Sequence, residues 1–288
     1  MSFKTFLESA MDSNGFFTDM KSIMLFLQKH RTSQFKPDAT TKQVQLYAAT
    51  FTNVEEDHLP IRISKADNIT IKYSKITSLF GLPSDLDRLI ITGCVDLNEV
   101  SESNGLPRTH INLTLNAVGV NQLDLDQIES PSIQINECDN LESVHGGERH
   151  DLAPSTLNFF NCANLKKINV NLSGASKILS IDNCNNFKFG EDSIFNANIL
   201  KLDGNLSLSG ISISAPAVQY IQFYNLDGIT NILSLAEIDS LRMVSMVDGD
   251  NSKDWLSIVN AHLRKDNRDM FDLQSELIDA GYESIAQL

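Results

Sequence analysis

One short segment contains the kinds of side chain that could form a metal site or a catalytic group. Residues 145–151 read His-Gly-Gly-Glu-Arg-His-Asp, so His145, Glu148 and His150 lie close together in the sequence. Imidazole and carboxylate groups bind zinc or transfer protons. However, two histidines on one helix face need i, i+4 spacing, and the double glycine leaves the backbone unrestrained. We therefore interpret the segment as a solvated loop, and we predict no catalytic residues, no metal and no cofactor.

Four cysteines are spaced regularly along the chain. They occupy positions 94, 138, 162 and 184, at intervals of 44, 24 and 22 residues. No C-x-x-C pair occurs, so zinc-binding and thioredoxin-type functions are not indicated. A large apolar residue follows each cysteine by three positions: Leu97, Leu141, Leu165 and Phe187. Four thiols at one position of a repeat indicate a structural role, so we expect them to be buried and reduced.

The segments around the cysteines share an alternating apolar pattern, as in Leu157-x-Phe159-x-x-Cys162-x-x-Leu165-x-x-Ile168. Weaker copies place residues 49, 74, 118, 205, 226 and 246 at the position of the cysteine. The ten copies are separated by nine intervals over 197 residues, or about 22 residues each. The alternation predicts a short strand with one buried face. A repeat of this length predicts a solenoid of stacked coils that share one core.

This pattern resembles the leucine-rich repeat, L-x-x-L-x-L-x-x-N/C-x-L, in its C-x-x-L form, as in GCVDLNEV and NCANLKKI. The resemblance covers residues ~40 to ~248 and implies an α/β solenoid, a horseshoe of parallel strands. The rival architecture is the parallel β-helix, whose coils have similar length. The apolar C-x-x-L-x-x-[VI] segment favours the convex half of a leucine-rich repeat.

The chain divides into three regions in this interpretation. Residues 39–249 form the solenoid of about ten coils, and residues 1–38 and 250–288 form helical caps, because terminal coils would otherwise expose the core. Apolar residues at helical spacing predict helices over 3–12 and 18–30, then a helix to about residue 264 and a last helix from 267, ended by Gly281. The alternative is that these ends are a separate effector or docking module.

Composition excludes several partners. The 288 residues are 42% hydrophobic and 21% charged, and the net charge is −14. This charge argues against nucleic acid and anionic membranes, and it suits a protein partner with a basic surface. The N-terminus has no secretory signal, so we expect a cytoplasmic protein. The opening SFKTFLESA and the ending DLQSELIDAGYESIAQL are similar to ends of proteins of large tailed phages, which implies the host cytoplasm or the virion.

The candidate site is the strip of residues that alternate with the buried positions of the strands. In the horseshoe these residues line the concave face. We predict that the strip binds a protein through Asn136, Asn158, Phe160, Asp182, Asp203, Tyr220, Gln222 and Tyr224. Phe160 and Tyr224 lie three coils apart, roughly 14 Å, with Asp182 and Asp203 between them. Exposed aromatic side chains anchor interfaces; the alternative is that these polar residues simply solvate an open sheet.

Three functions follow from these patterns. The first is a non-enzymatic protein–protein interaction module, which binds a host protein if the source is viral. The second is a virion or internal structural protein of a phage. The third is a β-helix-type carbohydrate-active enzyme, which would need a carboxylate cluster on one coil face. The sequence indicates neither the partner's identity nor an oligomeric state.

Overall fold

The computed structural model describes residues 48–52, 67–149, 153–203, 206–226, 228–247, 254–265 and 267–286. The helices predicted within residues 1–38 lie outside these ranges. Among the described residues, ten strands form one parallel sheet, here called the long sheet. Its strands, in order, are β1 (Ala48–Thr52), β2 (Asn68–Lys72), β3 (Asp85–Thr92), β4 (Arg108–Asn116), β6 (Ser132–Asn136), β8 (Thr156–Phe160), β10 (Ile178–Asp182), β11 (Ile199–Leu202), β12 (Tyr220–Phe223) and β13 (Met243–Met246).

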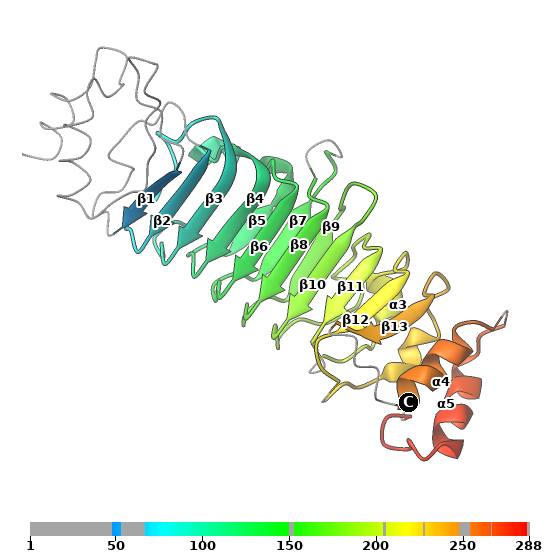
Figure 1. The fold of residues 1–288 in the computed structure, drawn as a ribbon. Helices are drawn as coiled ribbons and strands as arrows, with labels where there is room; N and C mark the ends of the chain where they lie inside the picture. The colour runs from blue at the N-terminus through cyan, green and yellow to red at the C-terminus, as the bar shows by residue number, and fades with distance from the viewer. Residues whose placement is uncertain are drawn as a thin grey trace, which may run out of the picture.

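Neighbouring strands of the long sheet belong to successive coils of a solenoid (Figure 1). Ile71 pairs with Ile91, a step of 20 residues, and Ile135 pairs with Phe159, a step of 24. Phe159 pairs in turn with Ile181, a step of 22. The predicted parallel solenoid with coils of about 22 residues is therefore confirmed.

The core is a continuous column of apolar side chains inside the stack. The inward residues of consecutive strands lie at paired positions, as Ile135, Phe159 and Ile181 do, and all three are buried. The apolar residue that follows each cysteine by three positions is also buried. Each coil thus covers the apolar surface of its neighbours, and no coil buries its own face alone.

A turn with a left-handed residue follows six consecutive strands of the long sheet. The left-handed residues of these turns, with φ between +49° and +65°, are Tyr73, Gly93, Ala117, Glu137, Asn161 and Asn183. This conformation costs a residue with a side chain about 1 kcal/mol. The backbone N–H groups of the first five donate to the next coil: Glu137 donates to the Phe160 carbonyl at 2.8 Å, and Asn161 to the Asp182 carbonyl at 3.0 Å. The strained turn therefore joins one coil to the next.

The residue after the left-handed one is the predicted cysteine position, and all four cysteines are buried and free. Each thiol donates to the carbonyl two residues earlier, as Cys138 does to Asn136 at 3.5 Å and Cys184 to Asp182 at 3.4 Å. Ser74 occupies the same position one coil before Cys94 and makes the same bond to Lys72, at 2.8 Å. A small side chain with one donor makes this bond in five coils, whereas the buried Val118 occupies the same position after β4 without it.

The segments after the cysteine position form a second parallel sheet, the short sheet, in the middle of the chain. Its strands are β5 (Gln122–Asp124), β7 (Ser143–Gly146) and β9 (Lys167–Val170). Within the described coils, the helical segments are single turns: Glu102–Asn104, Leu125–Gln127, α3 (Ile211–Ser214) and Ile232–Leu235. The C-x-x-L-x-x-[VI] segments, which we assigned to a convex half, are therefore extended where β7 and β9 lie.

Two helices follow the last strand, as predicted: α4 (Asp254–His262) and α5 (Met270–Asp279). The side chain of Asn260 on α4 pairs with the free edge of β13, because its Oδ1 accepts from the Val244 N–H and its Nδ2 donates to the Val244 carbonyl, both at 2.9 Å. The buried residues of the two helices are Trp255, Leu256, Val259, His262, Leu273 and Leu277. Two of the apolar residues whose spacing predicted the last helix, Phe271 and Ile278, are exposed.

The terminal coils correct the predicted register. Met243 is exposed and Val244 is buried, the reverse of the prediction, because Val244 pairs with the buried Ile221. Leu241 is buried in the turn before β13, so it begins the motif instead of lying in the strand. At the other end, Ala49 of β1 pairs with Ile69. Ala49 therefore lies within the strand and not at the cysteine position to which the pattern assigned it, and residues 44–46, which the pattern placed in the first strand, lie outside the described residues.

The buried thiols generate a prediction about reactivity. Burial raises the pKa of Cys138 to about 12 and also raises the pKa of Cys94. A hydrogen bond shared with Cys162, together with burial, raises the pKa of Cys184. At pH 8 we expect a bulky disulfide reagent to label the native protein only as fast as it unfolds, because the reactive species is the thiolate.

The same reagent should label all four thiols rapidly in denaturant. Fast labelling of the folded protein would contradict the burial of the four cysteines. A raised folded-state pKa also has a defined effect on stability. A thiol of the unfolded chain has a pKa of about 8.5. Below that pH these thiols should not affect the free energy of unfolding, which should fall as the pH rises from there toward 12.

Gly119 generates a second prediction, because two coils approach closely there. A Cβ at Gly119 would lie 1.9 Å from the carbonyl oxygen of Val95 in the preceding coil. We expect Gly119→Ala to cost about 3 kcal/mol, since the coils must separate to admit the methyl group. Gly174→Ala is the matched control: its φ is +80° but its Cβ would meet nothing closer than 3.4 Å. Gly174→Ala should lower the free energy of unfolding, measured in urea, by about 1 kcal/mol. Equal losses for the two variants would contradict close stacking at Gly119.

Candidate functional site

The outer face of the long sheet consists of the side chains that alternate with the buried ones, and strand pairing arranges them in rows across the coils. One row contains Asn136, Phe160 and Asp182. The next contains Gln134, Asn158, Ser180, Lys201, Gln222 and Ser245. The third contains Thr156, Ile178, Ile199, Tyr220 and Met243. The structure thus brings Asn136, Asn158, Phe160, Asp182, Tyr220 and Gln222 together on one face, as the alternation predicted.

The third row is apolar over four consecutive strands. Ile178, Ile199, Tyr220 and Met243 pair in sequence from β10 to β13, and Met243 is 41% exposed. Of these four, only Tyr220 was singled out from the sequence. The sequence could have indicated the other three as well. Each lies two residues before an outward residue of the same strand and therefore points to the same face of the sheet. We call these four residues the apolar row.

Phe160 and Tyr224 are the aromatic side chains at the other margin of this face, with 42% and 36% of their surfaces exposed. The Tyr224 hydroxyl lies 2.8 Å from the Ser180 hydroxyl. Ser180 belongs to β10, whereas Tyr224 directly follows β12, so the Tyr224 side chain crosses β11. The phenol therefore reaches the strand next to Phe160, and the roughly 14 Å expected from the coil spacing overstates the gap between the two aromatic groups.

The two predicted aspartates have different environments. Asp203 is only 6% exposed, and its Oδ1 accepts a hydrogen bond from the Asn225 amide at 2.6 Å. Asp182 is partly exposed. Partial burial, and then the negative charge of Asp203, raise the pKa of the Asp182 carboxyl. The acidic centre expected between the aromatic residues is therefore Asp182 at the surface, with the buried Asp203 in the next coil as a source of negative potential.

The outer face toward the N-terminal coils is mostly polar, with Ile90 of β3 as an outward apolar side chain. The amide of Asn136 donates to the Asn116 side chain at 2.6 Å, and the amide of Asn116 donates to the Thr92 hydroxyl at 3.1 Å. These side chains satisfy one another's hydrogen bonds across three strands. Leaving them exposed to water therefore costs little free energy, and they offer a partner few free donors or acceptors. Asn136 therefore lies at the boundary between the polar half of the outer face and the half that carries Phe160.

The histidine-containing segment is not a loop throughout, because His145 and Gly146 belong to β7 and pair with β9. The part after β7 is tied to the coil before it. One oxygen of Asp126 accepts hydrogen bonds from the backbone N–H groups of Gly147, at 3.0 Å, and Arg149, at 3.1 Å. His145 lies 3.8 Å from a carboxylate oxygen of Asp124, while His150 and Asp151 are outside the described residues. Nowhere in the described ranges do three His, Cys, Asp or Glu side chains gather closely enough to hold a metal ion.

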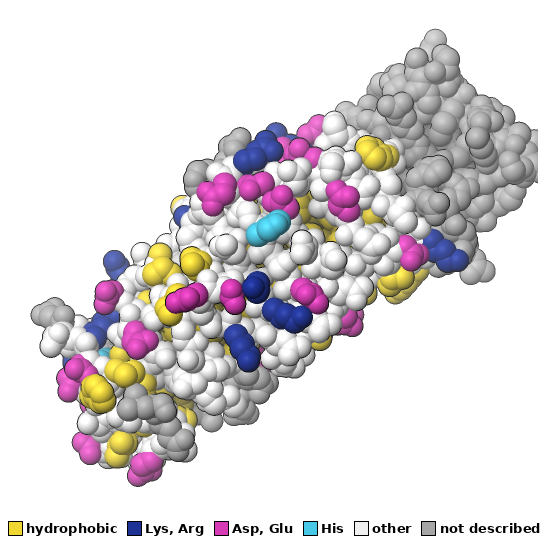
Figure 2. Space-filling model, turned by 180° about the vertical axis from the view of Figure 1, so that it is seen from behind, with side chains coloured by type: hydrophobic (Ala, Val, Ile, Leu, Met, Phe, Trp, Pro, Cys, Tyr) yellow, Lys and Arg dark blue, Asp and Glu magenta, His cyan; other side chains and the backbone are white. Residues whose placement is uncertain are grey.

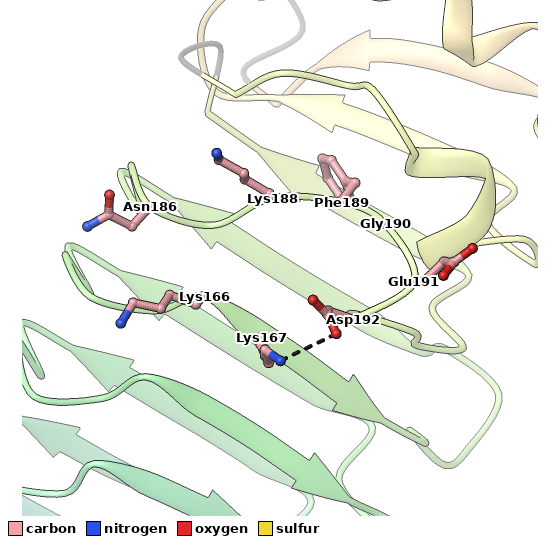
Figure 3. A pocket seen from close by; sticks show the side chains of 8 residues that line it. All are labelled: Lys166, Lys167, Asn186, Lys188, Phe189, Gly190, Glu191 and Asp192. Carbon is pink, nitrogen blue, oxygen red and sulfur yellow. Dashed lines mark ion pairs between the residues drawn. The ribbon is translucent and has the colours of Figure 1, made fainter.

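A second feature, which the sequence analysis missed, is a hollow beside the short sheet. It has a volume of about 730 Å³. Its lining residues are Lys166, Lys167, Asn186, Lys188, Phe189, Gly190, Glu191 and Asp192 (Figure 3). Seen from behind the view of Figure 1, basic and acidic side chains mix midway along the molecule (Figure 2). The sequence did contain a signal, because Lys166 and Lys188 each follow a cysteine of the repeat by four residues.

Comparison of the chain with protein family models, curated proteins and solved structures found no match. None of the helices in the described ranges combines the length and apolar character needed to cross a membrane.

Neighbouring residues of β8 generate a prediction that separates the core from the outer face. Phe159 is buried and Phe160 is largely open to solvent. We expect Phe159→Ala to lower the free energy of unfolding by about 3–5 kcal/mol, whereas Phe160→Ala should change it by less than about 0.5 kcal/mol. Urea unfolding of the two variants measures both values. A large loss for Phe160→Ala would mean that this residue supports the fold.

Proposed function

We propose that the chain is a non-enzymatic protein-interaction module, and that the outer face of the long sheet between β8 and β13 binds a partner protein with a basic surface. The observation that carries the proposal is the concentration of Phe160, Tyr224 and the apolar row on one half of a face that is mostly polar elsewhere. Residues of this kind become the buried centre of interfaces, surrounded by polar contacts.

The geometry of Tyr224 favours binding. Its hydroxyl contacts Ser180 two strands away, so the ring lies along the face before any partner arrives. A side chain already held in place loses less conformational entropy on binding than a mobile one does. The rows are also held by the backbone of a continuous sheet, so a partner meets a rigid surface.

The charge of the face favours a basic group on the partner. Asp182 lies next to Phe160 in the strand pairing, and it shares its surroundings with the negative charge of Asp203. A lysine or arginine placed beside Asp182 would relieve this repulsion and form a charge-assisted hydrogen bond. The overall charge of −14 would speed the encounter with a basic partner.

The leucine-rich-repeat resemblance supports the same function, because the strand-lined face of that family commonly binds proteins. The horseshoe curvature, the capping role of the helical ends and the phage origin stay predictions. In the phage setting the partner is a host protein and the location is the host cytoplasm. The virion structural protein and the β-helix-type carbohydrate-active enzyme also stay predictions, and the outer face favours the binding module over both.

A displayed library of random peptides tests the proposal without knowledge of the natural partner. We expect selection on the protein to enrich peptides that place one lysine or arginine between apolar or aromatic residues. The Phe160→Ala, Tyr224→Ala double variant should bind the enriched peptides at least about 30-fold more weakly, because the loss of even one buried anchor costs about 2 kcal/mol or more. Binding is measured by fluorescence anisotropy.

Lys72→Ala is the matched control, since Lys72 is exposed on the same sheet near its N-terminal end. It should leave the affinity unchanged. Asp182→Asn should weaken peptides that contain the basic residue and leave an uncharged variant of the same peptide unaffected. Enriched peptides that bind the double variant as tightly as the parent would contradict the proposal and direct attention to another surface.

A further inference from the structure

We propose that the hollow lined by Lys166, Lys167 and Lys188 binds a compact anion that carries several phosphate-type charges. The three lysines come from two successive coils, and the hollow they line is of the size that small-molecule sites have. This site lies beside the short sheet and does not depend on the binding function proposed for the outer face.

The repeat places two of the lysines at equivalent positions. Lys166 follows Cys162 by four residues and Lys188 follows Cys184 by four, so the two residues are stacked one coil apart. Adjacent strands are about 4.8 Å apart. Two lysines on neighbouring coils repel each other when their amino groups are left unpaired. An anion with neighbouring charges removes that repulsion and is contacted by both amino groups.

The hollow separates its charges. Lys166, Asn186 and Lys188 lie at one end, and Glu191 and Asp192 lie at the other, where Lys167 points to Asp192 (Figure 3). The Asn186 amide donates one N–H to the Ala163 carbonyl at 2.7 Å, which orients the group, and its second N–H is available to a ligand. The basic end thus offers two ammonium groups and one amide donor.

The ion pairs already present do not prevent binding. Lys166 lies 3.3 Å from Glu142, and Lys167 lies 3.3 Å from Asp192, but all four side chains are at least half exposed. Exposed pairs of this kind contribute at most about 1 kcal/mol, so a lysine gives up such a partner at little cost. Within the described residues, Lys188 has no carboxylate oxygen within 4.0 Å, and it is therefore the first cation available to an incoming anion.

The charge of the whole chain restricts the ligand to a compact one. A long polyanion would run past the hollow onto a surface that carries the rest of a net charge of −14, and it would be repelled there. A short chain of phosphoryl groups places its charge within reach of the lysines alone. Lysine contacts phosphoryl groups as a compact charge with three N–H donors. Arginine, by contrast, matches the planar geometry of a single carboxylate.

Isothermal titration calorimetry with tripolyphosphate at low salt tests the site on the full chain. We expect saturable binding of one anion, and the Lys166→Ser, Lys188→Ser double variant should bind at least about tenfold more weakly. Lys72→Ser, which removes an exposed lysine from the long sheet, should bind like the parent. Asp192→Asn should bind more tightly, because it releases Lys167. Protection of the four thiols verifies that each variant is folded.

Two further titrations distinguish the source of the phosphate groups. Equal affinity for tripolyphosphate and a nucleoside triphosphate assigns the site to the polyphosphate group alone, and tighter binding of the nucleotide assigns it to a nucleotide; both results support the proposal. Absence of saturable binding would overturn it. An equal loss of affinity in the Lys72→Ser control and in the double variant would also overturn it, since that result indicates non-specific attraction.

Discussion

The hydrogen bond from the left-handed residue of a turn to the next coil, made in five successive turns, is the interaction on which the rest of the solenoid depends. Asn161 and Glu137 adopt a conformation that their side chains disfavour, and in it their N–H groups reach the carbonyls of the neighbouring coil. The following residue is then directed inward beneath the turn, where Cys162 donates to the Phe160 carbonyl at 3.6 Å. The turn thus determines the stacking, and the stacking determines which positions are buried.

Stacking also turns any outward position into a row. Side chains at one position of the repeat become neighbours in successive coils, whatever their type. The amides of Asn116 and Asn136 bond to each other for this reason, the apolar row runs unbroken to Met243, and Lys166 lies above Glu142. Because the outward rows contribute little to the core, their composition can change from one end of the sheet to the other while the fold is kept.

The central coils could be predicted from the sequence because the cysteines mark one position of the repeat without ambiguity. Phe159 and Ile181 were assigned to the core by their distance from Cys162 and Cys184, and both are buried. The terminal coils lack that marker. In the last one, Leu241 and Met243 alternate as convincingly as Val244 and Met246 do, so pattern alone could not choose between two phases that differ by three residues.

The candidate site could be predicted only in part, for a related reason. Alternation shows which residues point outward, but it does not show contacts across several coils. The reach of Tyr224 to Ser180, and the burial of Asp203 under its bond to Asn225, depend on the positions of strands two coils apart. The hollow escaped notice because its lysines lie outside the strands of the long sheet, where the sequence contains no alternation to indicate a surface.

The two proposed sites share a coil, and the way that coil is held argues that they act independently. Phe160 faces outward at the end of β8, and Lys166 follows it after one turn that contains Asn161 and Cys162. That turn is bonded to the coils on both sides, since the Phe160 carbonyl accepts from Glu137 and the Asn161 N–H donates to Asp182. A ligand at either site could alter the other only by breaking these bonds, which support the whole stack. Coupling between sites requires an element with two arrangements of similar energy, and a turn bonded on both sides has one.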